Sequence, residues 1–434
     1  MLPLPGTSKL GLALSLLLAA CMWFYVQYVL IGHQQAEAAL HGIPRGNLSD
    51  LYPRWLGAHE LLLHHRDPYS TDVTREIQVG YYGRAIDPSR PNDPTDEQGF
   101  AYPVYVVFLL APTIWLPFPI VQVGFRWFLI ALTGASVLLW LRTLRWRLSP
   151  SATAVAIVLT LGSFPGLQGI KLQQLSLLVG GLIAGCAVLL VEGQLTVAGV
   201  LLALASIKPQ VTLPLSAWLL FWAFNDWRQR KNFVWGFCGT IAALVVAGEL
   251  VLPGWIGRFR QAVIAYRRYN NGAGSVLDEL VTPGWGRALA LAIVIALAIT
   301  CWRRRFADKD SSTFPWITVL VLAVTVVVIP KAAPYNQVLL LPGVLLIVRD
   351  WRMLWVKSRL TRACIVAAGV IVGWPWIAAC ALTLASLFLP PQSVQKGWAA
   401  PVYTSLAIPL AVAVLLMLYA SRFEQAHAPR QASA

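Results

Sequence analysis

The chain alternates long hydrophobic runs with short polar segments along most of its length. Most runs hold roughly 15–25 residues, which suits a membrane span, because a helix needs about 20 apolar residues to cross the hydrocarbon core. The pattern therefore predicts an all-α polytopic membrane protein with about twelve transmembrane helices. The predicted spans are residues 10–31, 120–141, 151–165, 172–190, 195–207, 209–225, 233–252, 287–302, 314–330, 336–349, 362–389 and 400–420.

Two apolar segments need separate treatment. Residues 10–31 follow a basic Lys9, but the run is long for a signal peptide and no small-residue cleavage site follows it, so we expect a retained first helix. Residues 103–117 are short and end in Leu116-Pro117-Phe118-Pro119. If this segment is re-entrant, the chain crosses twelve times; if it spans, the chain crosses thirteen times and one basic cluster lies on the wrong side. The first alternative agrees better with the charges.

One polar segment interrupts the pattern. Residues 31–101 hold ten of the 19 acidic residues and five of the six histidines. We therefore expect one membrane domain over residues 1–434, in which 31–101 is a large first extracytoplasmic loop. Residues 102–420 then hold the remaining helices, and 421–434 form a cytoplasmic tail.

Composition and charge support this organisation. The chain is 57% hydrophobic and 12% charged, where soluble domains carry about 25% charged residues. Its net charge of +15 comes from basic clusters between apolar runs, at 142–147, 228–231, 303–309 and 349–362. The positive-inside rule explains them as cytoplasmic loops, so nucleic acid is not expected as a partner. The six cysteines show no pairing or metal-ligand spacing and are expected to be small core residues.

The predicted topology collects the unusual polar features on the outer face, which would be the periplasmic or exterior side of an inner (plasma) membrane. They are the 31–101 loop and the segments 168–174, 208–210, 258–271 and 331–336. Polar residues at membrane depth are costly and therefore mark functional cavities. We expect one extracytoplasmic active site.

Within the loop, residues 46–69 predict an amphipathic helix. Ser49 or Asp50 is a plausible N-cap, and Asp67-Pro68-Tyr69 would end the helix. Apolar and aromatic side chains recur at helical spacing, which indicates a helix lying on the membrane surface. These residues are Trp55, Leu56, His59, Leu62 and Leu63. The carboxylates from Asp72 to Glu97 are expected to be solvated surface groups.

Several short segments follow one another along the chain in a recognisable order. After the Pro68-Tyr69 pair come Phe100-Ala101-Tyr102-Pro103, Gln173-Gln174-Leu175-Ser176-Leu177-Leu178, Lys208-Pro209-Gln210 and the proline-flanked stretch from Ile329 to Pro342. In this order the chain resembles glycosyltransferase family 87, membrane enzymes of the GT-C fold that use polyprenyl-phosphate sugars and include mannosyltransferases. The resemblance implies a polyprenyl-phosphate-sugar donor, a catalytic aspartate at Asp50 and a lipid or glycan acceptor. Val104 stands where a second proline is usual, Gln173 replaces glycine, and Asn336 replaces an acidic or histidine residue.

The chemistry of such a transfer can also be argued from the residues. It needs a base for the acceptor hydroxyl and cations for the departing phosphate. Asp50 is the candidate base, with an N-cap role as the alternative. Lys208 is the candidate phosphate ligand, because it interrupts two apolar runs; a snorkelling lysine is its alternative. Further candidate substrate-binding residues are Tyr69, Tyr102, Lys171, Gln174, Gln210, Arg258, Arg260, Arg267, Arg268, Lys331, Tyr335 and Asn336.

No cofactor or metal is expected beyond the donor substrate. His59 and His64 are not at the i, i+4 spacing that favours a metal pair, and Asp308-Lys309-Asp310 is better explained as a solvated charge run. Two other functions remain open at this point. One is a transporter or flippase of lipid-linked sugars, although no internal repeat is visible, and the other is a non-catalytic membrane scaffold or polymerase.

Overall fold

The structure is a computed structural model that describes residues 9–47, 49–269, 274–330 and 332–425, and within these residues it is all-α. The helices up to the end of the first loop region are α1 Lys9–Phe24, the π-helix η1 Tyr25–Leu30, α2 Ile31–Leu40, α3 Tyr52–His64, α4 Thr71–Tyr82, α5 Val106–Leu110 and the 3-10 helix η2 Ala111–Thr113. The remaining helices are α6 Phe118–Thr143, α7 Pro150–Gly162, α8 Phe164–Leu172, α9 Leu175–Val191, α10 Leu195–Ala205, α11 Pro209–Phe224, α12 Trp227–Val251, α13 Trp255–Tyr269, α14 Val276–Leu280, α15 Pro283–Arg303, α16 Thr313–Val328, η3 Pro334–Leu340, α17 Leu341–Lys357, α18 Arg359–Ala385, α19 Pro391–Gln395, η4 Ala400–Val402 and α20 Ala407–Gln425.

Six described helical segments are long and apolar enough to cross a membrane, or up to seven if the pair α7 and α8, bent by 58°, forms one span. The protein is therefore polytopic. Three shorter apolar helices, α9, α10 and α16, do not reach this length. The count of twelve spans and the GT-C arrangement stay predictions. So does the assignment of the whole chain to one domain, and residues 426–434 of the predicted cytoplasmic tail lie outside the described residues.

The first helix is longer than the sequence pattern predicts. α1, η1 and α2 form one continuous segment from Lys9 to Leu40, so the helix runs nine residues past the expected end at Ile31. The extension is rich in Ala, Gln and Glu, which are good helix formers, and its polarity hid it from a search for apolar runs. The loop proper therefore begins after Leu40.

The ambiguous segment 103–117 contains only short helices. α5 has five residues and η2 has three, and Pro117 precedes α6. At about 1.5 Å of rise per residue, α5 is far too short to cross a bilayer. This geometry agrees with the re-entrant alternative.

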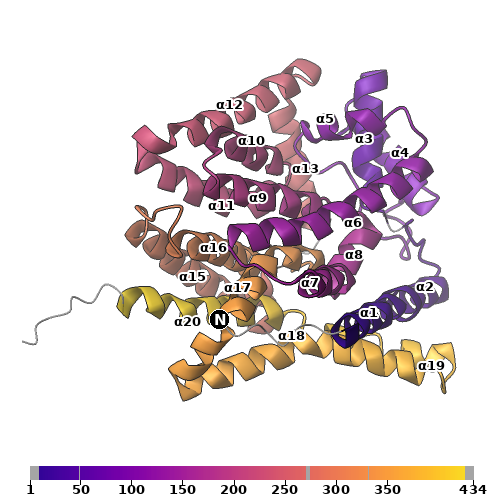
Figure 1. Cartoon of the computed structure of the whole chain (residues 1–434). Coiled ribbons are helices and arrows are strands. Elements are labelled where there is room, and N and C mark those ends of the chain that lie inside the picture. Colours follow the sequence, from indigo (N-terminus) through magenta and orange to yellow (C-terminus); the bar gives the residue numbers. More distant parts are fainter. Residues whose placement is uncertain (1–8, 48, 270–273, 331, 426–434) are drawn as a thin grey trace, which may run out of the picture.

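The loop helices lie together at one end of the molecule. Figure 1 shows α3 and α4 beside each other at the upper right, beyond the end of α6, while α1, α18 and α20 lie along the lower side. α3 also contacts α5. α4 and α5 cover part of α3, and its residues Trp55, Ala58 and Leu61 are buried by protein. That this helix lies on the membrane surface stays a prediction. Trp55 is buried as expected, but Leu56, His59, Leu62 and Leu63 are only partly buried.

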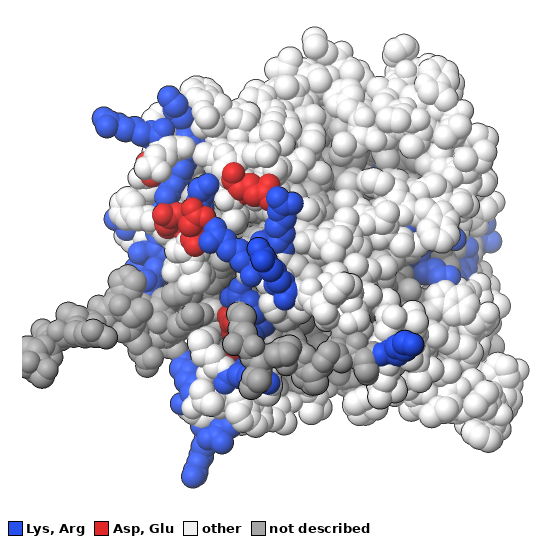
Figure 2. Space-filling view, viewed as in Figure 1, with Lys and Arg blue, Asp and Glu red and all other residues white. Residues whose placement is uncertain are grey.

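Ion pairs join the loops that the charge pattern assigns to the cytoplasm. Arg142 pairs with Glu192, and Arg145 pairs with Asp310. These contacts connect the ends of α6 and α9 with the loop before α16. Figure 2 shows charged side chains gathered at the left of the viewed face, where that loop lies, and a wide middle region without them. An uncharged band of this kind suits contact with lipid chains.

Two glycines allow α10 and α12 to approach closely. A Cβ built on Gly199 would lie 2.3 Å from the backbone oxygen of Phe233, and one built on Gly236 would lie 2.2 Å from that of Thr196. Because lipid offers little hydrophobic drive for helix association, close backbone packing of small residues stabilises such pairs.

We expect Gly199→Ala to destabilise the protein by about 1–3 kcal/mol, because the added methyl group meets backbone that cannot rotate away. The melting temperature in detergent measures the effect. Gly239→Ala on α12 is the matched control, because a Cβ there meets nothing within 4 Å. Equal melting temperatures for the two variants would contradict the packing argument.

Candidate active site

A cavity of about 1040 Å³ lies where the first loop region meets the membrane helices. All five of the polar segments noted in the sequence contribute to its wall. The lining polar residues are Asp50, Arg54, Asp96, Gln98, Tyr102, Gln174, Lys208, Gln210, Arg260, Tyr266, Arg267, Ser275, Asp278, Arg287, Tyr335 and Asn336.

Asp50 is held against the turn between α8 and α9. Its backbone N–H donates to the oxygen of Leu172 over 2.8 Å, and its Oδ2 accepts a hydrogen bond from the side-chain amide of Gln174. The neighbouring Ser49 is buried and donates from its hydroxyl to Oε1 of Gln173. These contacts fix the carboxylate of Asp50 at the cavity wall.

The predicted N-cap role of Ser49 or Asp50 is wrong. α3 begins at Tyr52, its N-cap residue is Leu51, and no side chain caps it. Pro53 in the first turn has no N–H, which lowers the need for a cap. The side chains of Ser49 and Asp50 instead form hydrogen bonds with the α8–α9 turn, so the N-cap role does not explain Asp50.

Gln173 occupies the position where the resembled family has glycine, and its backbone explains that preference. Its φ is 52°, in the left-handed region that glycine adopts at least cost. Here the side chain compensates by accepting from Ser49 and by donating from Nε2 to the oxygen of Gln122 over 2.6 Å. The turn therefore connects the first loop, α6 and α9.

Lys208 lies between α10 and α11, in a non-helical conformation. Pro209 explains this break, because the residue before a proline is pushed out of the helical region. The Lys208 side chain is buried; its Nζ donates to Oγ of Ser176 and, over 3.3 Å, to Oδ1 of Asn336. The ammonium also lies 4.9 Å from the ring centre of Tyr335. The contacts of this buried ammonium thus include two neutral oxygens and an aromatic ring.

Arg54 is the main cavity residue that the sequence analysis missed. Its NH1 donates to the backbone oxygen of Asp50 over 2.6 Å, and its guanidinium lies 4.6 Å from the ring centre of Tyr102. Its Nε is buried and has no hydrogen-bond partner among the described residues. The available signal was its place in the sequence, four residues after Asp50 in the segment predicted to be helical.

Tyr102 is largely buried and lines the cavity beside Arg54, and its backbone oxygen accepts from the hydroxyl of Tyr69 over 2.6 Å. Burial raises the pKa of the Tyr102 hydroxyl, and the Arg54 charge partly opposes this. The phenol therefore stays neutral and can donate a hydrogen bond to a ligand.

The structure places some predicted site residues at the cavity and others away from it. Those that line it are Asp50, Tyr102, Gln174, Lys208, Gln210, Arg260, Arg267, Tyr335 and Asn336. Tyr69 does not line the cavity, but it donates a hydrogen bond to the backbone of Tyr102, which does. Lys171 donates to Gln27 in η1, Arg258 pairs with Asp67 over 2.6 Å, and Arg268 is exposed outside the lining. Lys331 lies outside the described residues.

Most of the carboxylates from Asp72 to Glu97 were expected to be solvated surface groups, and two of them depart from this expectation. Asp93 is almost fully buried and pairs with Arg84. Asp96 lines the cavity. No periodic pattern marks these positions, because the segment after α4 has no regular structure up to Tyr102.

Comparison with known proteins gives one match. A sequence model described as glycosyltransferase family 87 matches residues 100–330, more than half of the chain. Comparisons with curated proteins and with solved structures found no match. The matched range includes Tyr102, Gln174 and Lys208, but it begins after Asp50 and Arg54 and ends before Tyr335.

We expect Gln173→Ala to lower stability more than Gln173→Gly. Both variants lose the hydrogen bonds to Ser49 and Gln122, worth about 1–3 kcal/mol together, but only glycine relieves the left-handed backbone, by about 1 kcal/mol. Melting temperatures in detergent should fall in the order wild type, Gly, Ala. A glycine variant less stable than the alanine variant would refute this account of the turn.

Proposed function

Because the chain belongs to glycosyltransferase family 87, we propose that it transfers a hexose, mannose being the favoured sugar, from a polyprenyl-phosphate donor to a lipid or glycan acceptor. The transfer takes place at the extracytoplasmic face of an inner (plasma) membrane and inverts the anomeric centre. One observation carries the proposal: a carboxylate, Asp50, and two cations, Lys208 and Arg54, line the same cavity.

Asp50 is the general base in this proposal. The acceptor hydroxyl gives its proton to the carboxylate while its oxygen forms a bond to the anomeric carbon, and the bond from that carbon to the phosphate oxygen breaks. The polyprenyl phosphate leaves with the electron pair. The hydrogen bond from Gln174 supports this role, because it orients the carboxylate at the wall.

Lys208 and Arg54 stabilise the phosphate. Negative charge develops on the leaving oxygen, and fixed cations in a site shielded from water stabilise it far more than they would in bulk solvent. The buried Nε of Arg54, which lacks a partner among the described residues, offers a donor for a phosphate oxygen. With these charges the transfer needs no metal ion at this cavity.

α13 supplies a wall suited to a lipid chain. Apolar and cationic side chains of this helix alternate at helical spacing along the cavity: Ile256, Phe259, Arg260, Val263, Ile264 and Arg267. The apolar side chains suit contact with a lipid chain, and Arg260 and Arg267 on the same face suit its phosphate headgroup. The pairing of Arg258 with Asp67 holds α13 to the first loop, on the same side as Asp50.

The assay that tests the function uses purified protein with a radiolabelled polyprenyl-phosphate mannose and a lipid extract as acceptor. A new glycoside together with released polyprenyl phosphate is the expected result. In sealed vesicles, a label that only changes leaflet would support the flippase alternative instead.

Asp50→Asn should lower the rate of transfer by about 10²–10⁴-fold with little effect on folding, because it removes the base while keeping the shape of the side chain. Asp72→Asn is the matched control, since Asp72 is exposed on α4 and lies outside the cavity lining. Wild-type turnover in Asp50→Asn would exclude Asp50 as the base.

Arg54→Gln should lower kcat/KM by about 10²-fold or more, since removing one preformed donor to developing charge costs about 3–4 kcal/mol. Lys208→Gln should act in the same direction. Arg75→Gln, in the same loop region but exposed and off the cavity, is the control. Unchanged kinetics in both cavity variants would place the phosphate elsewhere.

A further inference from the structure

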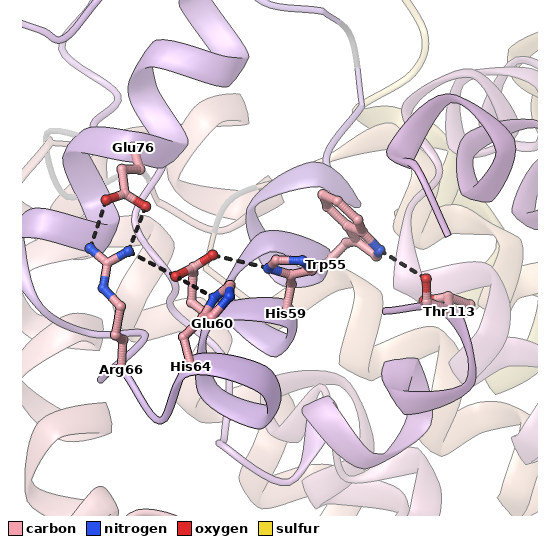
Figure 3. Close-up of polar contacts among 7 residues, drawn as sticks. All are labelled: Trp55, His59, Glu60, His64, Arg66, Glu76 and Thr113. Carbon is pink, nitrogen blue, oxygen red and sulfur yellow. Dashed lines mark hydrogen bonds and ion pairs between the residues drawn. The ribbon is translucent and has the colours of Figure 1, made fainter. Parts of the chain in front are cut away.

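A second group of polar side chains lies on α3, away from the cavity. His59, Glu60 and His64 occupy its last two turns, and none of them lines the cavity. Figure 3 shows the Glu60 carboxylate beside both imidazole rings and joined to them by hydrogen bonds. The transfer reaction proposed above leaves these residues without a role.

The three side chains already converge. Nδ1 of His59 lies 3.0 Å from Oε1 of Glu60, and Nδ1 of His64 lies 3.2 Å from Oε2. One ligand atom from each residue can be chosen so that all three lie within 4.8 Å of one another. Bonds of about 2.0–2.1 Å at tetrahedral angles place neighbouring zinc ligands about 3.4 Å apart. Each imidazole nitrogen already lies within that distance of one oxygen of the carboxylate, His59 of Oε1 and His64 of Oε2.

We propose that His59, Glu60 and His64 bind a divalent transition-metal ion, with Zn²⁺ the best-suited species. Two imidazoles and one carboxylate are a ligand set that zinc uses, with a fourth position left for water. Imidazole nitrogens favour zinc and its neighbours over Mg²⁺ or Ca²⁺, which prefer oxygen ligands. The sequence spacing argued against a metal pair, but it compared the two histidines alone, and Glu60 is the residue at i, i+4 from His64.

The three side chains differ in exposure, so a metal ion could approach them from the solvent side. The Glu60 side chain is only 7% exposed, whereas His59 is 25% and His64 53% exposed. An ion can therefore reach the imidazoles from solvent while the carboxylate is held in place. Small rotations of the two imidazole rings would bring one nitrogen of His59 and one nitrogen of His64 close enough to bind the same ion.

Arg66 occupies part of this site in the absence of metal. Its NH1 donates to Oε2 of Glu60 over 2.8 Å, and the same guanidinium makes two bonds to Glu76 on α4, of 3.0 and 2.6 Å. When a cation binds Glu60, Arg66 can withdraw and keep both bonds to Glu76. The metal and Arg66 thus compete for one carboxylate, and the contact between Arg66 and Glu76 on α4 survives the exchange.

Titration of Co²⁺ into untagged, chelator-treated full-length protein in detergent tests the proposal. We expect about one equivalent to bind with the visible absorption bands of a tetrahedral site, and Zn²⁺ to displace it. His59→Ala, His64→Ala and Glu60→Gln should each weaken binding at least about 100-fold, since even outer partners of metal ligands contribute 10–100-fold. Arg66→Gln should tighten binding about two- to fivefold, the effect of removing a partly exposed competing ion pair.

His41→Ala is the matched control, because His41 and Glu37 form an exposed i, i+4 pair that belongs to no group of three metal-ligating side chains among the described residues. It should leave the titration unchanged. Equal Co²⁺ binding by wild type and by the His59, His64 double variant would overturn the site, as would the absence of tetrahedral bands. Circular dichroism checks that the variants fold, which half-exposed His64 should tolerate. The result of the Co²⁺ titration is independent of the transfer assay, because none of the three proposed metal-binding residues lines the cavity.

Discussion

A positive charge buried among apolar helices must be stabilised, and this requirement shapes the proposed site. Lys208 is almost fully buried, yet its ammonium faces the neutral oxygens of Ser176 and Asn336 and the ring of Tyr335. Removing an ammonium from water costs several kcal/mol unless hydrogen bonds replace its hydration shell. The break before Pro209 makes this solution possible, because it leaves a polar gap between two apolar helices.

The first loop depends on the same region of the membrane domain. Asp50 is fixed by the α8–α9 turn, and Ser176, the second residue of α9, contacts Lys208. The base and the phosphate ligand of the proposed reaction are therefore held by adjacent parts of one helix–turn–helix. Gln173 at φ 52° is the residue whose backbone makes that turn.

Much of the fold could be predicted from apolar runs, because burial in lipid requires them. The predicted ranges 209–225 and 314–330 agree closely with the bounds of α11 and α16, although neither helix is among the six candidate membrane spans. The pattern failed where polarity and helix formation coincide, as in the extension of the first helix to Leu40. It also failed for contacts that only the tertiary structure creates: Arg54 stands one turn after Asp50, but its place over Tyr102 depends on residues 48 positions apart in the chain. The convergence of His59, Glu60 and His64 could not be seen from histidine spacing alone.

The central claim is that a donor phosphate binds beside Asp50, between Lys208 and Arg54. A structure determined with a non-transferable polyprenyl-phosphonate mannose measures this directly. The account predicts the phosphonate oxygens within hydrogen-bond distance of Lys208 and Arg54, with the anomeric carbon facing Asp50 and the lipid chain along α13. A phosphonate bound outside this cavity, with Lys208 still donating to Ser176 and Asn336, would contradict it.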